Sequence, residues 1–237
     1  MAVNYNNKIV TNGLSFYLDA RNTKSYPGSG TTWTDLSLGK YSSTLVNSPT
    51  FSNSEFAFNG TNNRVTATSF ASATTIISNF TYTFWCRPTA TISTASESTS
   101  GISGVSGQKY VIKPYHGGAT NGGAGVSVGT NGVGVFEHGD SYLPCLLFSS
   151  TSISNTVQTN ITIVYVNKQP RLYINGSIVR YGLTSAKTNI YGYTDWFGQG
   201  DYGYFSGAIA SIAVYNRSLS DAEVMQNFQA HRGRYGV

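Results

Sequence analysis

Pairs of carboxylates are the first feature to examine, because retaining hydrolysis of a glycosidic bond needs two carboxyl groups about 5–5.5 Å apart. The chain has four glutamates, Glu55, Glu97, Glu137 and Glu223. None of them stands in a run of alternating Glu and Asp, which would place two carboxylates on one face of a strand. No Gly-x-Ser-x-Gly elbow occurs at a strand-to-helix turn either. We therefore expect no catalytic residues and no enzymatic activity.

The closest pair of unlike acids is Glu137 and Asp140, with His138 between them. An acid–base site and a metal site are the two chemical alternatives for this stretch. Zinc needs three or four converging ligands, and adjacent residues on a strand point to opposite faces. The intervening glycine favours a surface turn, which is our interpretation of the stretch. The other two histidines, His116 and His231, have no evident partners in the sequence.

Aromatic side chains are concentrated in residues 191–204, where six aromatic residues and two aspartates occur in fourteen positions. Aromatic faces pack against the apolar face of a sugar ring, and they also anchor protein partners at low entropic cost. A third alternative is an internal plug made by Trp196 and Phe197, and the sequence leaves all three open. The candidate ligand or interface residues are Tyr191, Tyr193, Asp195, Trp196, Gln199, Asp201, Tyr202 and Tyr204.

Short strands must position these residues, because alternating apolar and polar residues recur along the chain between turn residues. A Pro-Gly-rich loop covers residues 19–30, and residues 89–107 are rich in Ser and Thr and predict a long exposed loop. The predicted strands cover residues 14–18, 55–58, 64–66, 80–87, 109–113, 161–166, 171–174 and 208–215.

Two further segments have characteristic patterns. Residues 117–134 contain eight glycines, which predicts a loop and a thin, flexible hairpin, since glycine weakens a strand unless something approaches its backbone closely. Asn175-Gly176 lies between apolar runs and predicts a hairpin turn. A single helix is predicted after Ser220, with Glu223 at the fourth capping-box position, and it ends near Gly233.

The composition agrees with an all-β protein. Of 237 residues, 40% are hydrophobic and only 11% are charged, so Ser, Thr, Asn, Gly and Tyr supply the polarity. The net charge is +5, but the basic residues are scattered, and we expect no nucleic-acid partner. Cys86 and Cys145 match no metal spacing, and burial of Cys86 in a strand is favoured over a disulfide. We expect one domain over residues 1–237, without a membrane span or signal peptide.

Four ordered stretches resemble the laminin-G-like domains of the concanavalin A-like lectin/glucanase superfamily. They are Gly13-Leu-Ser-Phe-Tyr-Leu-Asp19, Phe80-Thr-Tyr-Thr-Phe-Trp-Cys-Arg-Pro88, Leu172-Tyr-Ile-Asn-Gly-Ser-Ile-Val179 and the segment from Phe205 to Val224, which contains Tyr-Asn-Arg and Leu-Ser-x-x-Glu. The resemblance implies an antiparallel β-sandwich of the concanavalin A-like jelly-roll type with one short C-terminal helix. Residues 26–36 and 226–236 resemble, within this family, the domains found in tail and capsid proteins of phages.

The phage resemblance implies a non-catalytic virion structural protein, in a capsid decoration or a tail, assembled in the host cytoplasm. Its partners would be other virion proteins, further copies of itself and a host-surface glycan. The alternative is a carbohydrate-binding module for cell-surface glycans, and a glycoside hydrolase is a distant third.

The usual topology of the family also places Tyr115 and His116 beside the aromatic segment. Calcium is the one cofactor that the resemblance implies, because relatives bind it with loop aspartates and carbonyl oxygens. The proposed calcium ligands are Asp19 and Asp140, and Asp35, Asp195 and Asp201 lie in similar predicted loops. For each aspartate, stabilisation of its own turn is the alternative role.

Overall fold

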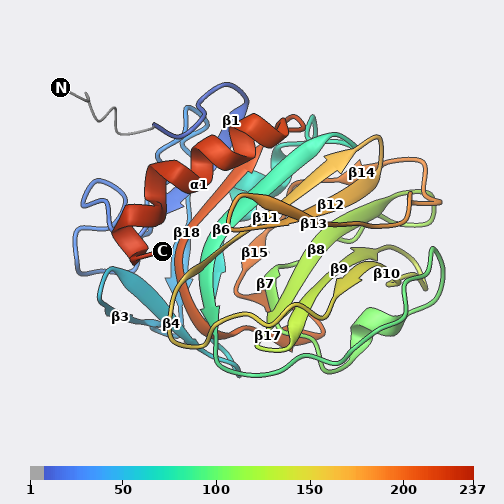
Figure 1. Cartoon of the computed structure of the whole chain (residues 1–237), viewed down its shortest axis with the longest axis horizontal. Helices are drawn as coiled ribbons and strands as arrows, with labels where there is room; N and C mark the ends of the chain where they lie inside the picture. Colours follow the sequence, from blue (N-terminus) through green and yellow to red (C-terminus); the bar gives the residue numbers. More distant parts are fainter. Residues whose placement is uncertain (1–7) are drawn as a thin grey trace.

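Two largely antiparallel sheets stacked face to face, with one helix on the outside, form the computed structural model, which describes residues 8–237 (Figure 1). The segment 1–7, on which the absence of a signal peptide was predicted, lies outside the described residues. No helix among residues 8–237 has the length and apolarity needed to cross a membrane. The predicted sandwich with a C-terminal helix is confirmed.

The first sheet carries the helix on its outer face. Its central strands are predicted almost to the residue, because their large apolar residues alternate cleanly. In order across the sheet, the strands are β13 (Ser177–Tyr181), β12 (Gln169–Ile174), β11 (Thr159–Val166), β6 (Phe80–Pro88), β18 (Ser206–Tyr215), β4 (Glu55–Asn59) and β3 (Thr50–Ser52), with β1 (Leu14–Asp19) also paired to β18.

The second sheet carries the candidate site. Its long strands β8 and β9 form a hairpin, and the aromatic segment supplies several very short strands. In order, the strands are β10 (Cys145–Ser149), β9 (Gly132–His138), β8 (Gly122–Gly129), β7 (Tyr110–Ile112), β15 (Trp196–Phe197), β5 (Arg64–Thr66) and β2 (Thr44–Val46), with β14 (Ile190–Tyr191), β16 (Gln199–Gly200) and β17 (Gly203–Tyr204) attached beside this path.

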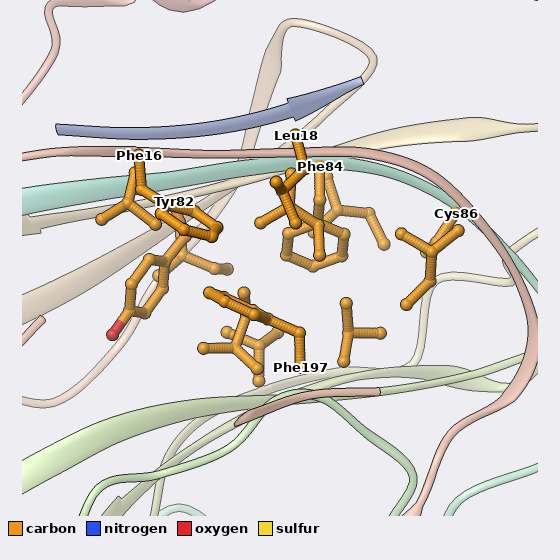
Figure 2. Packing of buried hydrophobic residues seen from close by; sticks show 14 of the residues in the cluster. Phe16, Leu18, Tyr82, Phe84, Cys86 and Phe197 are labelled. Carbon is orange, nitrogen blue, oxygen red and sulfur yellow. The ribbon is translucent and has the colours of Figure 1, made fainter. Parts of the chain in front are cut away.

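The core fills the space between the two sheets. Figure 2 shows side chains from β1 and β6 meeting Phe197, which rises from β15 in the opposite sheet. The Phe197 ring lies 5.2 Å from that of Phe16, centroid to centroid. Cys86 is part of this core, and both Cys86 and Cys145 are buried free thiols, as the preference for burial over a disulfide predicted.

The glycine-rich hairpin differs from its prediction. Every residue of β8 and β9 is buried, so the hairpin is a central part of the sheet and not a thin, flexible one. Ala124, Val126 and Val128 face the core, so the glycines between them face outwards. A Cβ on Gly123 would lie 1.9 Å from the carbonyl oxygen of Tyr115. Glycine is therefore needed because another stretch of backbone crosses this strand.

The helix α1 (Asp221–Tyr235) packs on the first sheet (Figure 1). Its capping box forms as predicted, because the Ser220 hydroxyl accepts from the Glu223 N–H and the Glu223 carboxylate accepts from the Ser220 N–H. The helix continues past Gly233, where its end was predicted. Tyr235 stacks on Trp85 at 4.4 Å between ring centroids, and Gly236 provides the left-handed cap at φ 71°.

The Ser/Thr-rich segment 89–107 contains a short 3-10 turn, η2 (Ser103–Val105), and forms no strand. It is less exposed than predicted, because it lies on the outer face of the second sheet. The Gly104 N–H donates to the Leu143 carbonyl at 2.9 Å, and the Tyr110 hydroxyl donates to the Gly104 carbonyl at 2.9 Å. This cover buries a small outer cluster around Tyr110 and Phe136.

The edge strand β13 follows the predicted turn at Asn175-Gly176, where both residues have positive φ. Its pairing with β12 slips by one residue, because Arg180 faces Leu172 whereas Ile178 faces Tyr173. Val179 is therefore the extra residue of a β-bulge. All five residues of β13 are exposed.

Candidate functional site

The segment that crosses the glycines of β8 positions the candidate site. This crossing segment, residues 113–117, is held at both ends. The Lys113 N–H donates to the Trp196 carbonyl at 3.2 Å, and the Thr194 hydroxyl donates to the Lys113 carbonyl at 2.8 Å. At the other end, the Gly117 N–H donates to the His138 carbonyl at 3.0 Å. His116 is thereby fixed above β8 and β9.

A hollow of about 410 Å³ opens beside the crossing segment, and we call it the hollow below. Its polar side chains come from three places in the chain that are distant in sequence: the crossing segment, the end of β9 with the following turn, and the aromatic segment. It is lined by Ile102, Val105, His116, His138, Gly139, Asp140, Ser141, Tyr142, Leu143 and Tyr202.

An ion pair lies at the mouth of the hollow. The Nε2 atom of His116 is 2.9 Å from the Oδ1 atom of Asp140, and both side chains are more than half exposed. His116 therefore has a partner, contrary to the sequence prediction. The turn that carries Asp140 is closed by the Tyr142 and Gly139 backbones, with Ser141 at φ 48°. Asp140 thus lies on the surface turn that was predicted for this stretch.

His138 forms the inner wall of the hollow. Its ring centroid is 4.7 Å from that of His116 and 5.5 Å from that of Tyr202, and both pairs meet edge to face. The residue is buried, and its Nδ1 atom has no hydrogen-bond partner among residues 8–237. Burial and the neighbouring His116 hold the pKa of His138 below its ordinary value, although the Pro114 carbonyl opposes this. The ring is therefore neutral at neutral pH.

Glu137 was interpreted as part of the surface turn, and this is wrong. The residue belongs to β9 and is completely buried, on the opposite face of the strand from His138. Hydroxyls of Ser185, Tyr142 and Tyr165 donate to its carboxylate. Burial raises the pKa of Glu137 to about 7, although these hydrogen bonds counteract the rise. Glu137 and Asp140 therefore occupy different environments.

The aromatic segment is divided between the core and the surface. Phe197 is fully buried as a plug, and Tyr193 and Gln199 are also buried. Tyr202 is half-buried and lines the hollow. Tyr204 is half-buried on β17, where it pairs with Gln199 of β16. The internal-plug alternative thus describes Phe197, and the exposed alternatives apply to the end of the segment.

Trp196 is half-buried and its ring is covered by cations. The Lys113 ammonium lies 3.8 Å from the ring centroid, and the Arg64 guanidinium carbon lies 5.2 Å away. Lys113 also lies 3.3 Å from Asp195 and 3.5 Å from Asp201. These contacts hold the aromatic segment against the crossing segment.

Tyr115 does lie beside the aromatic segment, as the family topology implied. Its ring centroid is 5.0 Å from that of Tyr193, which in turn stacks on Tyr191 at 5.0 Å. The structure therefore groups the predicted residues in two places. His116 and Tyr202 share the hollow, whereas Tyr115, Tyr191 and Tyr193 form a separate aromatic stack.

The aspartates proposed as calcium ligands are engaged in local contacts. Asp19 is buried and accepts from the Tyr17 hydroxyl at 2.9 Å and from Arg234 at 2.7 Å. Asp35 is buried and accepts from the Tyr17 N–H at 2.8 Å. Within residues 8–237, no group of three or more His, Cys, Asp or Glu side chains is arranged to hold a metal ion. Calcium binding stays a prediction.

Sequence reasoning missed some residues of the site. Lys113 appeared only as the end of a strand, and Ile102 and Val105 appeared only as part of a polar loop. Their shared signal is an apolar or charged residue next to glycines, which is too common to identify a site. His231 was left without a partner, but its Nε2 atom lies 3.4 Å from the Tyr17 hydroxyl, far along the chain.

Comparison with solved structures finds the same fold in carbohydrate-binding and toxin domains. The binding domain of botulinum neurotoxin DC in complex with SialylT matches with a TM-score of 0.65 and 11% identity over 93% of this chain. A Trypanosoma rangeli sialidase in complex with sialic acid matches with a TM-score of 0.57 and 13% identity over 95% of this chain. This chain spans 52% of the toxin chain and 34% of the sialidase chain.

At these identities the structural likeness shows the fold alone. The binding domain of Paraclostridial Mosquitocidal Protein 1 is similar in the same way, with a TM-score of 0.60, 15% identity and coverage of 91% of this chain and 52% of that one. A sequence search of curated proteins gives no match. A family model does match, over residues 59–225. The chain therefore belongs to the concanavalin A-like lectin/glucanases superfamily.

Proposed function

We propose that this chain is a non-catalytic carbohydrate-binding domain and that a saccharide binds in the hollow. The observation that carries the proposal is the meeting of Tyr202, His116, His138 and Asp140 around one open space on the outer face of the second sheet. Aromatic edges and faces bury the apolar side of a sugar ring, and a carboxylate and an imidazole exchange hydrogen bonds with its hydroxyls. Both kinds of group are present.

Solved structures with this fold support the carbohydrate proposal. One toxin binding domain is described in complex with SialylT, and entry of botulinum neurotoxin type C is described as dependent on two ganglioside molecules. These ligands belong to those proteins. They support the present proposal because the same fold presents binding surfaces for glycans there.

The environments of the carboxylates support a non-catalytic role. Glu137 is sealed inside the sandwich, whereas Asp140 faces solvent, so the two do not form a pair across a substrate. The other three glutamates are paired with arginines: Glu55 with Arg87, Glu97 with Arg180 and Glu223 with Arg217.

Tyr202→Ala tests the site. Removing this ring should weaken glycan binding at least about tenfold, because the apolar face of the sugar loses its contact, whereas Tyr202→Phe should keep most of the affinity. The measurement is a glycan array followed by titration calorimetry of the best ligand, with calcium and with EDTA. Tyr181→Ala is the matched control, because Tyr181 is exposed on β13. Equal affinity of Tyr202→Ala and the unmodified chain would reject the site.

A second function is carried by a different surface. Nine large apolar side chains are exposed among residues 8–237. Five of them belong to β13, the residues just after it and the facing side of α1; we call this set the apolar patch, and it consists of Ile178, Val179, Tyr181, Leu183 and Met225. We propose that the patch packs against a second copy of the chain within a phage particle, the virion role that the sequence resemblance implies.

A further inference from the structure

We propose that the hollow selects neutral saccharides and discriminates against those that end in sialic acid. This inference rests on the proposed function and adds the chemical class of the ligand. It follows from the charges around the hollow and from one buried nitrogen without a partner.

The charge of the lining is the first step. Among the described residues that line the hollow, Asp140 is the only Asp, Glu, Lys or Arg. Its side chain is 57% exposed, so it meets any ligand that enters. A carboxylate brought within about 4 Å of it is repelled, even at the high effective dielectric of a protein surface. A sialic acid therefore enters only by keeping its carboxylate away from Asp140.

The nearby cations do not compensate for Asp140, because each is already engaged. Lys113 lies between Asp195 and Asp201 and over the Trp196 ring. The Lys187 ammonium donates to the Ala119 carbonyl at 2.7 Å and lies 4.3 Å from the Tyr142 ring centroid. Recognition of a carboxylate relies on charge-assisted hydrogen bonds from Arg or Lys. Neither residue lines the hollow to make such bonds.

His138 is the second step. A neutral imidazole has one donor nitrogen and one acceptor nitrogen. The Nδ1 atom of His138 is buried without a partner among residues 8–237, although the residue lines the hollow. Buried polar atoms in folded proteins nearly always have a partner, so this nitrogen favours a ligand that supplies one. With the Asp140 carboxylate beside it, the hollow is rich in acceptors and fits a ligand whose hydroxyls donate.

Matched pairs of glycans test this inference, each pair having the same neutral core with and without a terminal sialic acid. On an array, and then by titration calorimetry, the neutral member should bind about tenfold more tightly than the sialylated one. The methyl ester of the sialic acid, which is equally bulky but uncharged, should recover most of the loss. Stronger binding of the sialylated members would overturn the inference and leave the proposed function standing. Failure of every glycan would overturn the proposed function itself.

Two variants assign the selectivity to residues. Asp140→Asn should raise the affinity for sialylated glycans about tenfold and change that for neutral ones much less, whereas Asp221→Asn on α1 removes the same charge elsewhere and should change neither. His138→Phe fills the same space without the nitrogen and should weaken neutral glycans about tenfold. Thermal unfolding verifies that each variant is folded. Unchanged selectivity in a folded Asp140→Asn variant would overturn the charge argument.

Discussion

Glu137 links the hollow to the interior of the sandwich. Tyr142 lines the hollow, and its hydroxyl donates to the Glu137 carboxylate at 3.1 Å. Tyr165, from the opposite sheet, donates to the same carboxylate at 3.1 Å. A single acid thereby ties the two sheets together directly behind the site. Because it is fully buried, its ionisation is paid for in conformational stability.

The stability of the fold should therefore depend on pH through Glu137. Its pKa is about 7 in the folded chain, against an ordinary value of 4.5. Between these pH values the unfolded chain loses the proton and the folded chain keeps it. The free energy of unfolding should thus be highest below pH 4.5 and should fall by about 3 kcal/mol as the pH rises through 7. Urea unfolding between pH 5 and pH 8 measures this slope.

Glu137→Gln should remove most of that slope, since glutamine does not titrate. Glu97→Gln is the matched control. Burial favours a raised pKa for Glu97, but hydrogen bonds from Arg180 and the Phe148 N–H outweigh it and lower the pKa. The contribution of Glu97 is therefore lost only in acid, and its removal should leave the slope between pH 5 and pH 8 unchanged. A slope that persists in Glu137→Gln would contradict the assignment.

At the scale of elements, β8 and the crossing segment form one unit. The glycines of β8 allow the Pro114–Tyr115 backbone to pass over the strand, and the same backbone carries His116 to the hollow. The composition of β8 is thus a requirement of the site. Contact with Gly125 is similarly close, since a Cβ there would lie 2.6 Å from the Pro114 nitrogen.

Gly123→Ala should destabilise the chain by about 1–3 kcal/mol, because its methyl group has no room beneath the Tyr115 carbonyl. The displaced crossing segment should also weaken glycan binding. Gly233→Ala is the control, because a Cβ there meets nothing within 4 Å, and the change should stabilise α1 by about 1 kcal/mol. Thermal unfolding and glycan titration measure both effects. A Gly123→Ala variant as stable as the unmodified chain would refute the close approach.

How far the sequence predicts these elements depends on their side chains. Strands with large alternating residues, such as β6 and β11, are predicted almost to the residue. The β8–β9 hairpin was located but placed at the surface, because glycines give no apolar signal and the burial comes from a distant segment. The end of α1 was missed because Tyr235 gains its partner, Trp85, only in the folded chain.

The candidate site was predicted in outline for a related reason. The aromatic segment and His116 were identified by residue type, and the structure places His116 and Tyr202 on one hollow. Burial divides the segment in a way that its composition does not show, with Phe197 in the core and Trp196 under Lys113. The roles of His138 and Glu137 depend on which face of β9 each occupies, and a predicted turn hid that alternation.

At the scale of the whole molecule, the hollow and the apolar patch are different surfaces made of different residues. Glycan binding and self-association should therefore be separable. The double variant Val179→Lys and Tyr181→Lys should shift the chain towards monomer in sedimentation velocity, because it charges the apolar patch, while glycan affinity stays unchanged. Tyr202→Ala should do the reverse. A chain that is already monomeric at high concentration would contradict the proposed packing.

The bulge at Val179 limits what that packing can be. Arg180 lies opposite the core residue Leu172 and pairs with Glu97, so the edge of β13 carries both a bulge and a charge on its inner side. Both features oppose strand-to-strand addition. Many copies crowded side by side on a particle would thus touch through side chains and remain individually folded units, without zipping into a continuous, amyloid-like sheet.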